Sequence, residues 1–296
     1  MKNTDLLLDD LLGKVPPKTV NLDISKLHPF EGHPYKVLDN EDMEALVESI
    51  RTQGVLTPLC VRQMEDDAYE IISGHRRLHA CKKAGIGTVP ALIYSLDRNA
   101  AAIALVDSNM HREHILPSEK AFAYKLKMDA LSRQGQRTDL TSRQVVGTFE
   151  SADLISETES GRQVQRYIRL TYLIPELLDL VDEEKIALTP AVELSYLTDE
   201  EQYSLLGTIE EEDRTPSLSQ AVRFKKLSQA GELSDESIET IMQEDKANQK
   251  PMFKVSMERL QKVAPKVKDK DFEDFVLKAC EHYYRYLQRQ RNRDAR

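Results

Sequence analysis

The sequence predicts an α+β module, followed by an all-α domain with a helix-turn-helix and by a small helical C-terminal unit. Short strand-like runs alternate with helix-like runs between residues 19 and 97, and the strand signal disappears after that. A charged and polar stretch then separates the helical middle from the last residues of the chain. The 296 residues exceed one typical domain of roughly 100 to 200 residues, so two or three domains are expected.

The α+β module begins with the strand-like run KTVNLDISKL and continues with a helix in LDNEDMEALVESIRTQG. The apolar residues of that helix, Met43, Leu46, Val47 and Ile50, follow helical spacing. PLCVRQ and YEIISG flank the turn-forming MEDDA, which predicts a hairpin, and VPALIYSL predicts a further strand. Between these strands HRRLHACKKAG is typical of a helix that ends at a glycine.

The all-α part begins with RNAAAIALVDSN and SEKAFAYKLKMDALSRQG. Pro117 and Ser118 predict a break between these helices, with Ser118 as the N-cap of the second. SLSQAVRFKKLSQAG predicts a later helix, and the polar run after it suits a mobile connection. We therefore expect a flexible N-terminus over 1–18, the α+β module over 19–115, the helix-turn-helix domain over 116–230, a linker over 231–250 and a C-terminal unit over 251–296.

Composition narrows the class of protein. A net charge of -9 argues against a uniformly basic nucleic-acid coat and leaves room for a local basic face. The chain has no run of about 18 apolar residues, and its N-terminal run MKNTDLLLDDLLGKVPP carries acidic residues, unlike a signal peptide. We expect a soluble, cytoplasmic protein with no membrane association. Cys60, Cys81 and Cys280 lack the spacing of a zinc site or a disulfide framework, so we expect each in a core.

The stretch IISGHRR predicts an anion-binding turn. Gly74 stands between a strand and a basic helix, where it lets the backbone approach a ligand. Free N–H groups at the start of the helix attract anions. Arg76 and Arg77 add fixed positive charge with bidentate geometry for phosphate oxygens. The alternative is an ordinary strand-to-helix turn with exposed arginines.

A second candidate segment is ALVDSNMHREHILPSEKA. Asn109 and Arg112 lie three residues apart near a predicted helix end. Four further polar residues surround them: Asp107, His111, Glu113 and His114. Such a cluster could serve a nucleotide and a divalent cation, because hard cations take oxygen ligands from carboxylates and amides. It could equally be a solvated helix end, and the two histidines lack the partners of a zinc site.

A third segment, SETESGRQVQRYIRL, predicts a DNA-reading helix. Its apolar face carries Val164, Tyr167 and Ile168, and the opposite face carries Arg162, Arg166 and Arg169, with Gln163 and Gln165 on the flanks. Arginine and glutamine reach guanine and adenine edges, and Ser160 at the start could donate to a phosphate. LTSRQVVGTF, with Thr141 as a cap, supplies the preceding helix of a helix-turn-helix, although the link between the two is long. The alternative is a solvated arginine face.

The C-terminal run KDFEDFVLKACEHYYRYLQRQRNRDAR predicts a helix with an apolar stripe. The stripe steps by four and three residues through Phe272, Val276, Ala279, Tyr283 and Tyr286. It must pack on its own unit or on a second copy, so self-association is a hypothesis. The arginines that follow could hold DNA without sequence preference: Arg285, Arg289, Arg291, Arg293 and Arg296.

The order of these motifs resembles the ParB family of chromosome and plasmid partition proteins. LTPLCVR, YEIISGHRRLHACKKAGIGTVPALI, SNMHREHILPSEKAFAY and RQVQRYIRL follow each other as in that family, over roughly residues 19–230. The resemblance implies an N-terminal CTP-binding module, a middle domain for a centromere-like site on double-stranded DNA, and a dimerising C-terminal segment. It further implies Mg²⁺, a dimer that closes as a CTP-dependent clamp, a ParA-type ATPase partner and a place on the nucleoid.

The resemblance also assigns nucleotide-binding residues by position. Gly74, His75, Arg76 and Arg77 match the glycine-X-Arg-Arg motif, and Asn109 and Arg112 match the glutamate-Asn-X-X-Arg motif. The glutamate position holds Ser108, so hydrolysis of CTP is more doubtful than its binding, while Asn109 keeps the metal-ligand position. The same module resembles sulfiredoxin, whose loop carries a cysteine that this loop lacks. The alternative functions are a transcription regulator or nucleoid-associated factor without nucleotide switching, and then an enzyme whose main output is CTP turnover.

Overall fold

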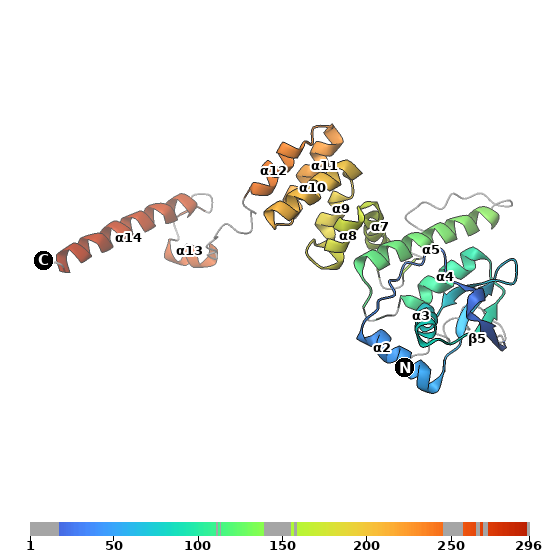
Figure 1. Ribbon diagram of the computed structural model, residues 1–296. Helices are drawn as coiled ribbons and strands as arrows, with labels where there is room; N and C mark the ends of the chain where they lie inside the picture. The colour runs from blue at the N-terminus through green and yellow to red at the C-terminus, as the bar shows by residue number, and fades with distance from the viewer. Residues whose placement is uncertain are drawn as a thin grey trace. The chain divides into compact units, whose positions relative to one another are not determined.

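A five-stranded mixed sheet forms the centre of the α+β module (Figure 1), in the order β1-β5-β3-β4-β2. The computed structural model describes residues 18–110, 112, 114–138, 155–156, 159–244, 257–264, 267–268 and 272–294. The strands are β1 (Thr19–Asp23), β2 (Leu27–His28), β3 (Leu59–Gln63), β4 (Tyr69–Ser73) and β5 (Thr88–Tyr94). β3 and β4 pair antiparallel, which confirms the predicted hairpin, and β3 pairs parallel with β5.

Alternation along the strands divides the core into two layers. Val61 and Ile71 face one layer, together with α2 (Glu41–Gln53) and α3 (His75–Ala84). Cys60 and Ile72, one residue away, face the other layer and pack with α4 (Arg98–Asn109). This follows from the two-residue period of a strand, because neighbouring side chains point to opposite faces. Both faces of the sheet are therefore covered, and the end of β4 is held between helices.

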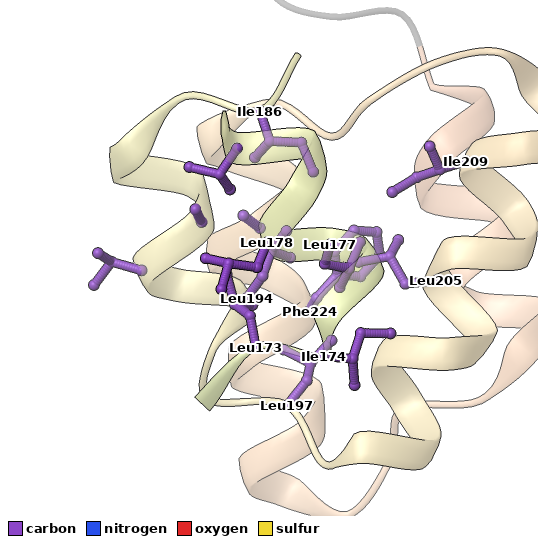
Figure 2. Packing of buried hydrophobic residues seen from close by; sticks show 14 of the residues in the cluster. Leu173, Ile174, Leu177, Leu178, Ile186, Leu194, Leu197, Leu205, Ile209 and Phe224 are labelled. Atoms are coloured by element: carbon purple, nitrogen blue, oxygen red, sulfur yellow. The ribbon is translucent and has the colours of Figure 1, made fainter. Parts of the chain in front are cut away.

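Helix α5 (Pro117–Thr138) runs beside α4 (Figure 1) and continues into the helical part of the same unit. That part contains α7 (Gly161–Arg169), a 3₁₀ turn (Leu170–Tyr172), α8 (Pro175–Asp182), α9 (Leu188–Leu194), α10 (Asp199–Glu212), α11 (Leu218–Ala230) and α12 (Asp235–Gln243). Leu177, Leu205 and Phe224 meet at the centre of its core (Figure 2), and Phe224 is fully buried. Ala121 of α5 belongs to the same core, so α5 joins both parts of the unit.

The expected linker over 231–250 is wrong for residues 235–243, which form α12. Ile238, Ile241 and Met242 are buried in the core of the helical part. Their spacing of three and one residues places them on one face of the helix. Asp235, Glu236 and Glu239 of the same helix are exposed, so a charged composition concealed an amphipathic helix.

The expected N-cap role of Ser118 is also wrong. Helix α5 begins at Pro117, where the missing N–H of proline costs nothing. Ser118 is buried, and its backbone N–H and its hydroxyl donate to the two carboxylate oxygens of Asp182, at 2.9 and 2.6 Å. The serine thus fixes the start of α5 to the end of α8.

Residues 245–296 form a separate unit. Its described elements include α13 (Met257–Val263) and α14 (Phe272–Asp294). Phe272 is buried, but Tyr283 and Tyr286 of the predicted stripe are 62% and 50% exposed. Cys60 and Cys81 are buried as expected, whereas Cys280 is exposed, so the core assignment of Cys280 is wrong. No helix within the described ranges is both long and apolar enough to cross a membrane.

Candidate nucleotide pocket and DNA-facing helix

A pocket of about 250 Å³ opens where β4 ends and α3 begins. All seven residues predicted to bind a nucleotide line it: Gly74, His75, Arg76, Arg77, Ser108, Asn109 and Arg112. The remaining lining comes from Ser73 and from the loop before α2, through His33, Tyr35, Lys36 and Val37. The fold therefore brings together two segments that lie more than thirty residues apart, at the N-terminus of α3 and at the end of α4.

Gly74 is required by the backbone at the pocket floor. It lies at φ 107° and ψ 20°, and it occupies the N-cap position of α3 without a side chain to cap the helix. A Cβ at this position would lie 3.0 Å from Leu59 Cγ and 3.3 Å from Arg77 Cζ. Glycine therefore leaves both the strained conformation and the close packing accessible.

Arg76 and Arg77, which follow Gly74 and His75, make different contacts. Arg77 Nη1 donates to the carbonyl oxygens of Thr57 and Pro58, each at 2.6 Å, so this guanidinium supports the loop before β3. Arg76 lines the pocket and has no bonding partner among the described residues. Arg112 lies 5.6 Å from the centre of the Tyr35 ring, where a cation–π attraction orients it. Arg76 and Arg112 thus offer free cationic donors.

A pair of stacked histidines forms one wall of the pocket. The rings of His33 and His75 lie 3.6 Å apart between centres, tilted by 33°. Burial, and then the neighbouring His33, lowers the pKa of His75 to about 3, and burial also lowers the pKa of His33 to about 4. His75 Nε2 accepts from the Phe30 N–H at 3.3 Å, so its proton lies on Nδ1. Both rings are neutral at pH 7, and they offer polar contacts without charge.

The predicted metal position does not form a metal site by itself. Asn109 Nδ2 donates to the Leu105 carbonyl at 2.8 Å and to Ser108 Oγ at 3.3 Å, which leaves one amide oxygen for a ligand. Ser108 Oγ donates to the same carbonyl. The described lining of the pocket contains no carboxylate, whereas Mg²⁺ is normally held through one or two carboxylates together with phosphates. The protein donors therefore do not fit a resident Mg²⁺ ion.

The other polar residues of this segment do not converge on the pocket. Asp107 pairs with Lys127, and His114 is exposed beside a second pocket. His111 and Glu113 lie outside the described residues. No group of three or more histidine, cysteine, aspartate or glutamate side chains that could hold a metal occurs within the described part of the chain.

Helix α7 has the amphipathic arrangement that its sequence predicts. Val164 is fully buried, and Tyr167 and Ile168 pack beside it. The Ser160 hydroxyl caps the helix by accepting from the Gln163 N–H at 3.4 Å. Arg162 is exposed, and Gln163 and Gln165 are partly exposed. Thr141, the expected cap of the preceding helix, lies outside the described residues.

The other two arginines of α7 are held by the protein. Arg166 donates to Gln163 Oε1 at 3.0 Å and to Thr189 Oγ1 at 2.6 Å, which links α7 to α9. Arg169 donates to the hydroxyl and the carbonyl of Ser195, at 3.0 and 2.7 Å. Its guanidinium also lies 4.4 and 4.0 Å from the ring centres of Tyr172 and Tyr196. Of the three predicted arginines, Arg162 is thus the most available to a ligand.

Residue patterns alone did not single out His33, Tyr35 and Lys36 as pocket residues; only the family resemblance placed the stretch LHPFEGHPYKV near the nucleotide pocket, although it lacks the arginine-rich form common there. They belong to the loop HPYKV, which has no glycine motif and no periodicity. Tyr35 is held in place by its buried ring and by a long contact of 3.5 Å from its hydroxyl to the Val106 carbonyl. Only the tertiary fold brings this loop to the pocket, although a lysine next to a buried aromatic residue gave a weak signal.

The family model and the sequence relatives that match this chain all indicate the same family. The family model described as the ParB N-terminal domain matches residues 13–109. The chain is 34% identical over 206 residues to a nucleoid occlusion protein of Listeria innocua, which covers 69% of this chain and 67% of that protein. It is 31% identical over 242 residues to a probable chromosome-partitioning protein ParB of Vibrio cholerae, which covers 81% of this chain and 77% of that protein.

Among solved structures, the chain is similar to the C-terminally truncated chromosome-partitioning protein ParB of Caulobacter crescentus complexed with CTP-gamma-S. The two share 26% identity, the match covers 65% of this chain and 99% of that chain, and the TM-score is 0.31. The family assignment rests on sequence relatives such as these two, which are more than 30% identical to this chain across at least two thirds of their length. The chain belongs to the ParB family of partition proteins.

Proposed function

We propose that this protein binds CTP in the pocket between β4 and α3, binds double-stranded DNA through α7, and closes on DNA as a CTP-dependent clamp during segregation of a chromosome, plasmid or mobile element. The observation that carries the proposal is the convergence of Arg76, Arg112 and Lys36 on the glycine turn at the start of α3. Cationic donors around a helix N-terminus suit a chain of phosphates. The choice of CTP follows the family resemblance, because ParB of Caulobacter crescentus was solved with CTP-gamma-S.

The residues of the pocket would divide the work of binding. The backbone N–H groups after Gly74 and the guanidinium groups of Arg76 and Arg112 would hold phosphate oxygens. The neutral His75 would donate through Nδ1, and Arg77 would keep the loop of Thr57 in position. Ser108 and Asn109 would border the same ligand from the end of α4.

Binding is a better match to these residues than efficient hydrolysis. Hydrolysis needs a group that orients or deprotonates water close to the terminal phosphate. The described lining supplies neutral imidazoles and no carboxylate. We therefore propose a nucleotide switch with at most weak CTPase activity.

The DNA-binding part of the proposal rests on α7. Arg162, Gln163 and Gln165 lie on the exposed and partly exposed side of the helix, where arginine and glutamine can reach base edges in the major groove. Arg166 would reach a base through the N–H groups that Gln163 and Thr189 leave free. Ser160 at the helix start and Arg169 at its end would contact the phosphate backbone of the DNA or stabilise α7.

The proposed partners are a second copy of this chain, a ParA-type ATPase and nucleoid DNA in the cytoplasm. The exposed apolar side chains of α14, among them Leu277, Tyr283 and Leu287, support self-association of the C-terminal unit. Static light scattering at micromolar concentration tests this part, and a monomeric mass would contradict it.

Equilibrium binding of labelled CTP tests the nucleotide site. The unmodified protein should bind CTP, and Arg76→Ala should weaken binding by roughly ten-fold or more, the effect expected for a lost charge-assisted hydrogen bond. Arg51→Ala is the matched control, because Arg51 is an exposed arginine on α2 outside the pocket lining. No CTP binding by the unmodified protein would reject the clamp.

A second candidate is a nucleoid-associated factor that does not switch with nucleotide. The observation that favours it is the 34% identity to a nucleoid occlusion protein. Sequencing of DNA bound in cells, from the unmodified protein and from Arg76→Ala, separates the two. A clamp should spread from its sites and lose that spread in the variant, whereas a static factor should give narrow, identical peaks in both.

A further inference from the structure

Lys36 joins the nucleotide pocket to the helical part of the unit. Its side chain lines the pocket beside Arg76 and Arg112. These three residues also line a neighbouring cavity of about 470 Å³, together with Asp182. The Lys36 ammonium group lies 3.1 Å from Asp179 Oδ1 and 3.2 Å from Asp182 Oδ2, both on α8. A cation at the edge of the pocket is thus held by two carboxylates of another element.

The backbone and the side chain of Lys36 are held differently. The backbone N–H donates to Glu119 Oε1 at 2.8 Å, and Glu119 is buried at the start of α5. The side chain is 45% exposed, so its ammonium group can move while the backbone stays in place. The hydrogen bond with Asp179 is the main cause that raises the pKa of Lys36, so the side chain is charged at neutral pH.

The two carboxylates are not equivalent. Asp182 is 7% exposed and accepts both hydrogen bonds of Ser118, so it remains paired without Lys36. The Asp179 side chain is 64% exposed, and Lys36 is the only bonding partner of its carboxylate among the described residues. Departure of Lys36 would therefore leave Asp179 to solvent at little cost and keep Asp182 in place.

A triphosphate in the pocket would compete with α8 for this lysine. Its oxygens would carry more negative charge than the two carboxylates, and an ammonium group is a mobile point charge that can serve either site. Neither Arg76 nor Arg112 has a hydrogen bond to Asp179 in the described part of the chain, whereas Lys36 does.

We propose that Lys36 is a phosphate ligand in exchange with Asp179 and Asp182, so that nucleotide binding removes an ion pair between the pocket loop and α8. This inference rests on the proposed nucleotide site and adds a residue and a regulatory contact to it. As long as Lys36 is bonded to Asp179 and Asp182 of α8, the affinity of the pocket for nucleotide is lowered. The helical part that contains α8 also carries the proposed DNA-facing helix. Occupancy of the pocket in turn removes one of the two contacts described for the end of α8, while the bonds of Ser118 to Asp182 remain.

Labelled CTP binding to three variants of the full chain tests this exchange. Asp179→Asn should tighten CTP binding by roughly two- to five-fold, the effect of removing an exposed ion pair that competes with the ligand. Lys36→Gln should weaken binding by roughly ten-fold. Adding Asp179→Asn to Lys36→Gln should then change nothing, because the competing pair no longer exists.

The control is Glu183→Gln, which removes one negative charge directly after α8 from a residue paired with Lys185. Equal tightening by Glu183→Gln and Asp179→Asn would mean a general charge effect and would overturn the proposal. Normal CTP binding by Lys36→Gln would overturn it too, while leaving the nucleotide site intact. Absence of CTP binding by the unmodified protein would reject the site and the exchange together.

Amide hydrogen exchange gives a second test, because it would not change if the ion pair between Lys36 and α8 stayed intact when CTP binds. Addition of CTP should raise amide exchange in the last turn of α8, near Asp179 and Asp182, in the unmodified protein. The same addition to Lys36→Gln should leave that turn unchanged. Protection of this turn by CTP in the unmodified protein would contradict the exchange of Lys36.

Discussion

The Asp107 carboxylate lies 2.5 Å from the ammonium group of Lys127, and neither residue lines the nucleotide pocket. Lys127 is 8% exposed and also donates to the Ile155 carbonyl. The acidic residue next to Ser108 is therefore committed to a structural ion pair between α4 and α5. It does not replace the carboxylate that the family pattern places at position 108.

Asp107→Asn should lower the free energy of unfolding without changing CTP affinity. Removing the carboxylate leaves a largely buried ammonium group with one carbonyl partner, which should cost about 1–3 kcal/mol at this partial burial. Urea denaturation measures the change, with Glu48→Gln, a variant at an exposed ion pair on α2, as the control. A loss of CTP binding with unchanged stability would instead mean that Asp107 serves the pocket.

Gly74→Ala should destabilise the α+β module and abolish the pocket. The new methyl group would lie 3.0 Å from Leu59 Cγ at φ 107°, and strain of this kind costs about 1–3 kcal/mol. Gly87→Ala is the matched control, because a Cβ there meets nothing within 4 Å. Thermal unfolding measures the stability, and equal melting temperatures for both variants would contradict the packing argument.

The sequence predicted the α+β module well because its signals are local. Alternating apolar residues around Val61 and Ile71, and glycines at 74 and 85, mark strand and helix ends wherever the chain folds. The strand-to-helix turn at Gly74 was recognisable for the same reason. The loop that contains Lys36 could not be assigned to the pocket from residue patterns, because its position depends on partners that are 83 and 143 residues away.

Charge misled the prediction in the second half of the chain. The acidic residues around Ile238 suggested a linker, but a helix needs only one apolar stripe to enter a core. The three arginines on one face of α7 predict DNA contacts, and that stays a prediction. Spacing within α7 could not reveal that Arg169 also bonds Ser195 and packs on two tyrosine rings.

Arg169→Ala and Arg162→Ala should therefore change different properties: the first should lower stability, and the second should lower DNA affinity. Loss of Arg169 removes two hydrogen bonds and its contacts with Tyr172 and Tyr196, and should lower the free energy of unfolding by about 1–3 kcal/mol. Arg162 is exposed, so its loss should weaken DNA binding and change stability by less than about 0.5 kcal/mol. Denaturation and fluorescence anisotropy with the specific DNA site give the two readouts. Unchanged DNA affinity in Arg162→Ala would move the DNA contact away from this face.

The stacked histidines predict a steep loss of stability in mild acid. The pKa values of His33 and His75 fall to about 4 and about 3 in the folded protein, because both rings are partly removed from water and, for His75, because His33 lies beside it. In the unfolded chain histidine has a pKa of about 6.5, so below that pH the unfolded state binds more protons. Stability should be full above pH 7 and should decline as the pH falls from about 6.5 towards 4, by on the order of 1–2 kcal/mol per ring at pH 5.

Urea denaturation at pH 7 and pH 5 measures this decline. His75→Gln keeps an acceptor for the Phe30 N–H but cannot titrate, so the difference in stability between the two pH values should shrink. His79→Gln is the control, since His79 is partly exposed and bonds Asp39 outside the pocket. That variant should retain the full difference between pH 7 and pH 5. If His75→Gln retains it as well, the stacked pair is not the group that takes up protons on unfolding, and its neutrality in the pocket would have to be abandoned.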